Sequence, residues 1–207
     1  MVFAFIISTL TGERPFVLFY QVYTEIAPTI SSEPSDSQSE TVGHLSRTRG
    51  CKSHIAGIAE TVHSEYQFRR ETKSITAEED LARLTNDDTL PDFEMGHFTV
   101  PLSSLSSTFA ASDSMFVTWM GAAFTGFTLV CEACENRLLA EHILRLIVRF
   151  LQEHVRVLNQ PMEVASRVER VNEVLKRILR NGNLLFLNHR AVRQIEKELD
   201  SSMKTLS

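Results

Sequence analysis

The cysteines and one histidine are the residues with the clearest potential for chemistry. Cys131 and Cys134 have a Cys-x-x-Cys spacing, and Cys51 and His54 have a Cys-x-x-His spacing earlier in the sequence. These four side chains could form the tetrahedral set that binds Zn²⁺. A zinc-binding pair normally lies in a tight turn, whereas Cys131 ends an apolar stretch without small polar residues around it. We therefore interpret Cys131 as a buried strand residue, and we expect no metal site and no cofactor.

Catalytic motifs are missing from the rest of the sequence. None of the seven histidines belongs to a His-Glu-x-x-His pair, and no Gly-x-Ser-x-Gly elbow or phosphate-binding glycine loop occurs. Acidic pairs such as Asp87 and Asp88 lie in polar stretches, where solvated loop charge explains them. Because the side-chain combinations that catalysis needs do not occur, we expect that the chain is not an enzyme.

The composition is that of an ordinary globular protein with an acidic balance. The 207 residues are 43% hydrophobic and 23% charged, and the formal net charge is -5. Such a charge argues against nucleic acid or anionic lipid as a direct partner of the whole surface. Three cysteines in a chain of this length favour a reducing, cytoplasmic setting. Basic residues between 145 and 180 are interleaved with glutamates, which indicates an exposed face of ion pairs.

Hydrophobic periodicity predicts strands early in the chain and helices towards its end. The predicted strands are Val2–Ser8, Phe16–Tyr23, His97–Leu102, Met115–Met120 and Phe124–Cys131, and the predicted helices are Cys51–Arg70, Ala77–Leu84, Asn136–Leu158 and two more before the C-terminus. Val2–Ser8 is almost continuously apolar, as a strand covered on both faces should be. This order predicts an α/β (α+β) fold, a five-stranded antiparallel sheet with helices packed on its faces. We expect one domain, 1–207, with flexible loops at 28–50 and 71–114.

The predicted helix at 136–158 is apolar on two adjacent sides. Beside the usual stripe, a second stripe follows Leu144, Val148, Leu151 and Val155. One sheet cannot cover both stripes, so either a partner surface or another helix of the same chain must cover the second. We interpret the second stripe as a subunit interface, which favours an assembly component over a free-standing enzyme.

The order of elements resembles the longin-like fold of the small (sigma) subunits of heterotetrameric adaptor complexes. Met1–Ile7 looks like the first strand of a sigma subunit, and Glu135–Glu141 looks like the opening of its long helix. Two further segments, Thr118–Gly121 and Asn183–Asn188, are similar to the sigma subunits of the fifth adaptor complex. The resemblance covers the first ten residues and most of Val117–Leu199.

This resemblance implies a structural role in endosomal and lysosomal transport. A sigma subunit packs against one large subunit in a complex of two large, one medium and one small subunit, and the complex sorts membrane cargo. The fifth complex implies a cytoplasmic protein that is peripheral on late endosomes and lysosomes, with a nuclear pool left open. It also implies spatacsin and spastizin as partners, and from the net charge we expect no direct contact with nucleic acid. The alternative is a stand-alone longin-like module, such as a trafficking regulator or a GTPase-associated protein.

Some sigma subunits bind an acidic dileucine signal in a small apolar groove. Matching without gaps from the start of the long helix places Ala123, Val148 and Leu158 at that groove. Arg14 falls beside the basic position that reads the acidic residue of the signal, and Pro15 departs from the family pattern. The resemblance therefore implies a groove that either binds a signal peptide or packs against a neighbouring subunit.

Overall fold

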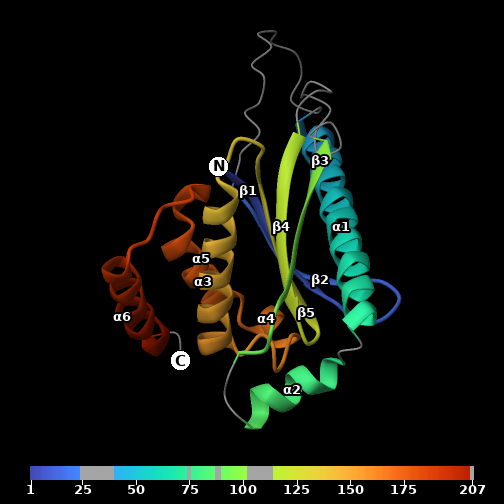
Figure 1. Cartoon of the computed structure of the whole chain (residues 1–207). Helices are drawn as coiled ribbons and strands as arrows, with labels where there is room; N and C mark the ends of the chain where they lie inside the picture. Colours follow the sequence, from blue (N-terminus) through green and yellow to red (C-terminus); the bar gives the residue numbers. More distant parts are fainter. Residues whose placement is uncertain (24–39, 74–75, 87–89, 102–113, 206–207) are drawn as a thin grey trace.

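The computed structural model describes residues 1–23, 40–73, 76–86, 90–101 and 114–205, and the side chains of 40–51, 77 and 86 lie outside this description. Within these ranges the chain forms a five-stranded sheet with helices on both faces (Figure 1). One long helix covers one face, and helices from the C-terminal third of the chain cover the other. The predicted α+β class with helices on both faces of a sheet is confirmed.

The sheet is antiparallel throughout. Its strands are β1 (Val2–Thr9), β2 (Val17–Val22), β3 (Glu94–Pro101), β4 (Ser114–Ala122) and β5 (Thr125–Glu132). They lie in the order β2-β1-β5-β4-β3, and every neighbouring pair is antiparallel. β1 therefore has a strand on each side, and its residues 2–8 are all buried. This central position explains the continuous apolar run at the start of the sequence, because both faces of β1 meet a core.

The sheet separates two apolar clusters. The first includes Phe5 and Phe127 and lies between the sheet and the C-terminal helices. The second includes Ile6 and Trp119 and lies under α1 (Glu40–Lys73), which contributes Val62. Phe5 and Ile6, which are neighbours in β1, belong to opposite clusters because side chains alternate along a strand.

The remaining helices follow in chain order. They are α2 (Ala77–Asn86), α3 (Arg137–Val155), α4 (Glu163–Ser166), α5 (Val168–Ile178), the short 3₁₀ helix η2 (Arg180–Gly182) and α6 (His189–Thr205). α3 begins at Asn136, whose side chain accepts a hydrogen bond from the Leu139 N–H at 3.1 Å. It ends at Arg156, which adopts a left-handed backbone with φ 58°. Figure 1 shows α3 against the sheet, with α5 and α6 beside it on the same side of the sheet.

Two expected loop segments contain regular structure. α1 already begins at Glu40, so the prediction of a loop at 28–50 is wrong for residues 40–50, whereas 28–39 lie outside the described residues. The segment 71–114 contains the end of α1, the whole of α2 and the whole of β3. Polar composition misled the loop prediction, because a helix needs only one narrow buried face. Whether the chain is a single domain over 1–207 stays a prediction.

The second apolar stripe of α3 is covered within this chain, so the argument that it needs a partner subunit is wrong. Leu144, Val148, Leu151 and Val155 are at most 1% exposed within this single chain. They belong to the same apolar cluster as Val174 of α5, and α5 packs against α3. The second of the two open explanations therefore holds: a helix of the same chain covers the second stripe.

Candidate functional site

The residues of the predicted signal groove do not form an open surface. Ala123, Val148 and Leu158 are at most 1% exposed. Val148 and Leu158 belong to the cluster between the sheet and α3, whereas Arg14 lies on the exposed turn between β1 and β2. The structure thus brings Val148 and Leu158 into one core but leaves them without accessible surface. A signal-binding role for these positions stays a prediction, and it would require this part of the core to open.

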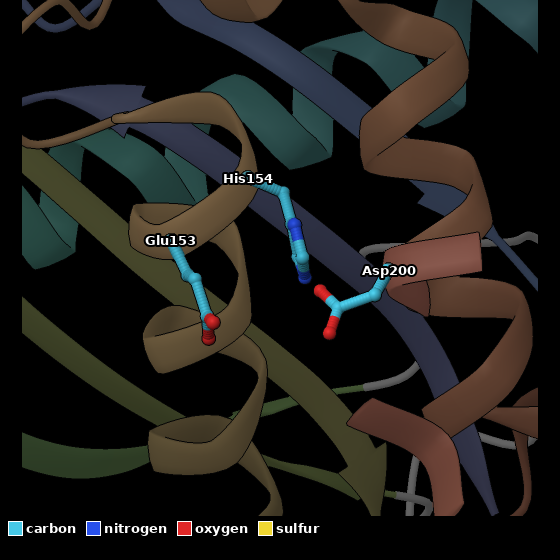
Figure 2. Close-up of side chains that lie close together, drawn as sticks. All are labelled: Glu153, His154 and Asp200. Carbon is cyan, nitrogen blue, oxygen red and sulfur yellow. The ribbon is translucent and has the colours of Figure 1, made fainter. Parts of the chain in front are cut away.

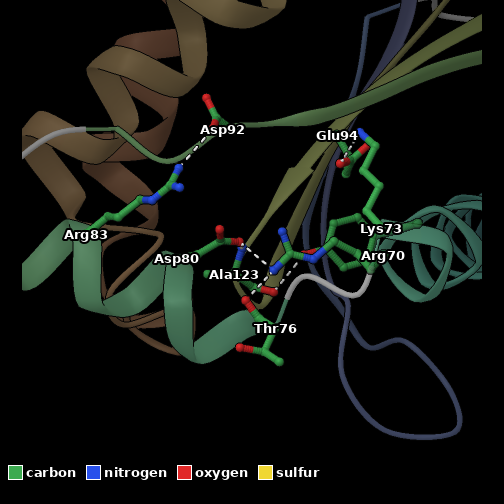
Figure 3. Close-up of polar contacts among 9 residues, drawn as sticks. Arg70, Lys73, Thr76, Asp80, Arg83, Asp92, Glu94 and Ala123 are labelled. Carbon is green, nitrogen blue, oxygen red and sulfur yellow. Dashed lines mark hydrogen bonds and ion pairs between the residues drawn. The ribbon is translucent and has the colours of Figure 1, made fainter.

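Ala123 is held in place by polar contacts from two helices. Its N–H donates to Asp80 Oδ2 of α2 at 2.8 Å, and its carbonyl accepts from the Tyr66 hydroxyl of α1 at 3.0 Å. Arg70 of α1 lies 3.0 Å from the same Asp80 carboxylate and donates to the Thr76 carbonyl at 2.5 Å (Figure 3). This network ties α1, α2 and the β4–β5 turn together, so Ala123 has a structural role here.

Arg14 lines a different hollow, on the α1 side of the sheet. This hollow has a volume of about 630 Å³. It lies between the β1–β2 turn and the C-terminal half of α1 and is lined by Glu13, Arg14, Pro15, Glu60, His63, Ser64, Gln67, Phe68 and Glu71. We call it the Arg14 hollow. None of Ala123, Val148 and Leu158 lines it.

The cysteine pair lies as the sequence predicts. Cys131 is buried in β5, and burial raises the pKa of its thiol to about 12. Cys134 is exposed just after β5, so the two thiols face different environments. Among the described residues neither joins a group of three metal-ligating side chains, and the Cys51 side chain lies outside the description. A thiol that is buried and protonated is a poor zinc ligand.

A different group of side chains approaches the spacing of a metal site. Glu153 and His154 at the end of α3 and Asp200 of α6 offer ligand atoms that all lie within 4.8 Å of one another. Figure 2 shows the three side chains converging, with the His154 ring pointing towards the Asp200 carboxylate. Both carboxylates are exposed, and exposed acidic groups commonly come together without a metal. Asp200 also shares a shallow hollow with Lys204, whose cation competes with a metal ion.

Four of the basic residues between 145 and 180 are paired with nearby glutamates. Ion pairs join Arg145 to Glu141, Arg149 to Glu196, Arg167 to Glu163, and Arg177 to Glu173 and Glu198. Their side chains are at least partly exposed, so each pair contributes little to stability. The predicted face of ion pairs is confirmed for these four arginines.

A second hollow joins two of the four segments that carry the family resemblance, Glu135–Glu141 and Asn183–Asn188. It lies between the N-terminus of α3 and the segment that leads into α6, and its volume is about 530 Å³. We call it the α3–α6 hollow, and it is lined by Asn136, Leu138, Leu139, His142, Phe186, Leu187, Asn188 and His189. Leu138 is 78% exposed and Phe186 is 83% exposed. Large apolar side chains exposed beside a concave apolar surface are typical of a protein-binding site.

The walls of the α3–α6 hollow are well defined. Asn136 caps α3, and Asn188 caps α6 by accepting from the Ala191 N–H at 2.9 Å. Neither helix has an acidic residue in its first turn, and no carboxylate lines the hollow.

Sequence reasoning missed this surface, although Leu184–Leu187 stands out as an apolar stretch outside any predicted helix. Its exposure depends on how α6 packs, which periodicity does not reveal.

Comparison with known proteins finds matches of the chain to one family. Residues 1–200 match the family described as "AP-5 complex subunit sigma-1". A human protein named AP-5 complex subunit sigma-1 is 43% identical over 86 residues, which is 42% of this chain and 43% of the relative. A mouse protein of the same name is 50% identical over 50 residues, which is 24% of this chain and 29% of the relative. These matches thus span less than half of the length of either curated relative.

Comparison with known structures also gave a match. A chain of a homology model of the full-length AP-3 complex in a stretched open conformation aligns with a TM-score of 0.46 and 16% sequence identity. The alignment covers 99% of this chain and 97% of that chain. Separately, no described helix combines the length and the apolar character that a bilayer-spanning segment needs.

Proposed function

This chain belongs to the family of AP-5 complex sigma-1 subunits, and from that premise we propose that it acts in endosomal and lysosomal membrane transport and cargo sorting. It does so as the small subunit of a heterotetramer with two large subunits and one medium subunit. Its action is non-covalent packing, without catalysis. Spatacsin and spastizin are proposed as further partners, and the complex as a whole brings the chain to late endosomes and lysosomes.

The α3–α6 hollow is the surface proposed to pack against a large subunit. The observation that carries this proposal is the exposure of Leu138 and Phe186 at one concave apolar site. Burial of one such side chain stabilises a complex by about 1.5–3 kcal/mol. Two of them together therefore form an anchor of the kind that dominates protein interfaces. The match of residues 1–200 to a family of complex subunits supports a protein as the occupant.

Co-expression with the other three subunits tests both parts of the proposal. We expect a stoichiometric complex with the wild-type chain and at least a tenfold loss of recovered large subunit with the double variant Leu138→Asp, Phe186→Asp. Met162→Asp is the matched control, because Met162 is 71% exposed but lies outside this hollow. The melting temperature of each isolated variant shows that the fold is kept.

The outcomes separate the surface from the function. A complex that forms equally well with the double variant would place the interface elsewhere on the chain. Failure of the wild-type chain to join any adaptor subunit would overturn the proposed function. It would favour the alternative of a stand-alone trafficking module.

A further inference from the structure

The Arg14 hollow carries an unbalanced charge. Three carboxylates, from Glu13, Glu60 and Glu71, face one guanidinium, from Arg14, so the formal charge of these four groups is three negative against one positive, or -2. None of the four makes an ion pair with another residue in the described parts of the chain. A hollow whose lining carries a net charge attracts partners of the opposite sign.

Exposed aromatic rings accompany these carboxylates. Phe68 lines the hollow and is 71% exposed, and Phe16, next to the lining residue Pro15, is 74% exposed. The Phe16 backbone is anchored, because its N–H donates to Thr9 Oγ1 and its carbonyl accepts from the Thr9 N–H, both at 2.8 Å. An aromatic face next to carboxylates suits a guanidinium or ammonium group, which can contact both.

His63 supplies an independent observation at the same place. His63 lines the hollow and is only 9% exposed, and its Nε2 atom is buried without a hydrogen-bond partner in the described structure. A buried polar atom without a partner costs free energy that a bound group could recover. Another lining residue is held in place, because Gln67 Nε2 donates to the Leu10 carbonyl at 2.7 Å.

A single metal ion fits this hollow poorly. No three of its carboxylate and imidazole ligand atoms fall within 4.8 Å of one another, whereas Glu153, His154 and Asp200 do. Because these charged groups do not converge on one point, a chain segment that contacts several of them suits the hollow better than a single ion. The negative balance also disfavours nucleic acid and anionic lipid, which would be repelled.

We propose that the Arg14 hollow docks a basic segment of a protein partner, with arginine or lysine next to a large apolar side chain. The basic groups contact Glu60 and Glu71, and the apolar side chain packs on Phe68. This inference rests on the proposed function, because it takes the partner to be a protein of the transport machinery. It reverses the expectation for Arg14, because three surrounding carboxylates select against an acidic signal.

A displayed library of random 12-residue peptides, selected on the full chain, tests the inference. Affinities of the recovered peptides are then measured by fluorescence anisotropy. We expect sequences with arginine or lysine next to phenylalanine or leucine, and affinity that falls as salt rises. The double variant Glu60→Gln, Glu71→Gln should weaken binding at least tenfold, and Phe68→Ser should weaken it as well.

The matched control removes the same charge on the opposite face of the sheet. Glu153→Gln together with Glu169→Gln alters exposed carboxylates of α3 and α5, and should change affinity less than twofold. Recovery of acidic or neutral peptides, or equal binding by the Glu60→Gln, Glu71→Gln variant, would overturn the inference. So would failure to recover any peptide. Assembly of the complex is tested separately, through the Leu138 and Phe186 variants. If the complex forms but the peptide tests fail, only this inference is overturned and the proposed function stands.

Discussion

Arg70 and Asp80 form the most deeply buried ion pair among the described residues. Their side chains are 7% and 3% exposed, and they lie 3.0 Å apart. The Asp80 carboxylate also accepts from the Ala123 N–H, so its removal leaves a buried guanidinium without its opposite charge and a buried amide without its acceptor. Breaking a buried pair by removing one member typically costs more than the pair itself contributes.

We therefore expect Asp80→Ala to lower the free energy of unfolding by about 3–5 kcal/mol. Urea unfolding followed by circular dichroism measures this change. The matched control is Asp92→Ala, which breaks the pair with Arg83, whose side chains are 92% and 53% exposed. The control should leave the urea midpoint unchanged within error, because solvent already screens that pair. Equal effects of the two variants would contradict the structural role of Asp80.

Cys131 makes the stability of the fold sensitive to alkaline pH. Burial raises the pKa of its thiol from 9.0 to about 12. The thiol therefore ionises first in the unfolded chain, so its contribution to stability is fully present below pH 9 and is lost as pH rises towards 12. The slope reaches about 1.4 kcal/mol per pH unit for one such group.

Urea unfolding between pH 8 and pH 10 checks this expectation. The wild-type free energy of unfolding should fall more steeply with pH than that of Cys131→Ala. Cys134→Ala should follow the wild-type slope, because Cys134 is exposed. Parallel slopes for all three proteins would show that the thiol of Cys131 ionises as easily in the fold as in the unfolded chain.

α3 combines two different apolar surfaces. Its middle and end, around Leu144 and Val155, are buried in the same apolar cluster as α5 and the sheet. Its first turn presents Leu138 to the α3–α6 hollow. A leucine of α3 thus lies in the core at position 144 and on an open surface at position 138, less than two turns earlier.

A charge introduced into α3 should therefore affect folding differently in the first turn of the helix and in its middle. We expect Leu144→Asp to prevent folding of the isolated chain, because a buried leucine contributes about 2–5 kcal/mol and an unpaired buried charge costs still more. Leu138→Asp should leave the melting temperature within about 2 °C of the wild type, since surface substitutions change stability by about 0.5 kcal/mol or less. Thermal unfolding of both variants is the measurement. A folded Leu144→Asp protein would show that a partner, and not α5, normally covers that position.

The molecule as a whole is a sheet with a helical layer on each face, and its two docking candidates lie on opposite faces. The Arg14 hollow belongs to the α1 side and the α3–α6 hollow to the α3 side. One hollow is lined by carboxylates and the other by none. The chain could therefore contact two chemically different partners at once, as a subunit inside a larger assembly would.

The exposed apolar anchor should also govern the behaviour of the isolated chain. We expect the wild-type chain to self-associate as its concentration rises, because Leu138 and Phe186 have no cover within it. Leu138→Ser with Phe186→Ser should remain monomeric at the same concentrations, with an unchanged melting temperature. Light scattering after size-exclusion chromatography measures this difference. A monomeric wild-type chain would show that the hollow does not attract a second copy.

The local patterns determined the order and type of most elements. The apolar run of β1 predicted a central strand, and the stripes of residues 136–158 predicted a long buried helix, which is α3. The start of α1 at Glu40 escaped prediction because its sequence is polar there. Periodicity reports how a residue faces its own helix or strand, and this information is local.

Tertiary packing alone decided which elements and side chains contact one another. Both apolar stripes of α3 were visible in the sequence, but only the position of α5 shows that the second stripe is internal. In the same way, the family resemblance implied an acidic ligand beside Arg14, and only the fold shows that Glu60 and Glu71 line the same hollow. The reason is physical: burial and electrostatic surroundings are set by residues distant in the chain, and their placement depends on how the helices pack on the sheet.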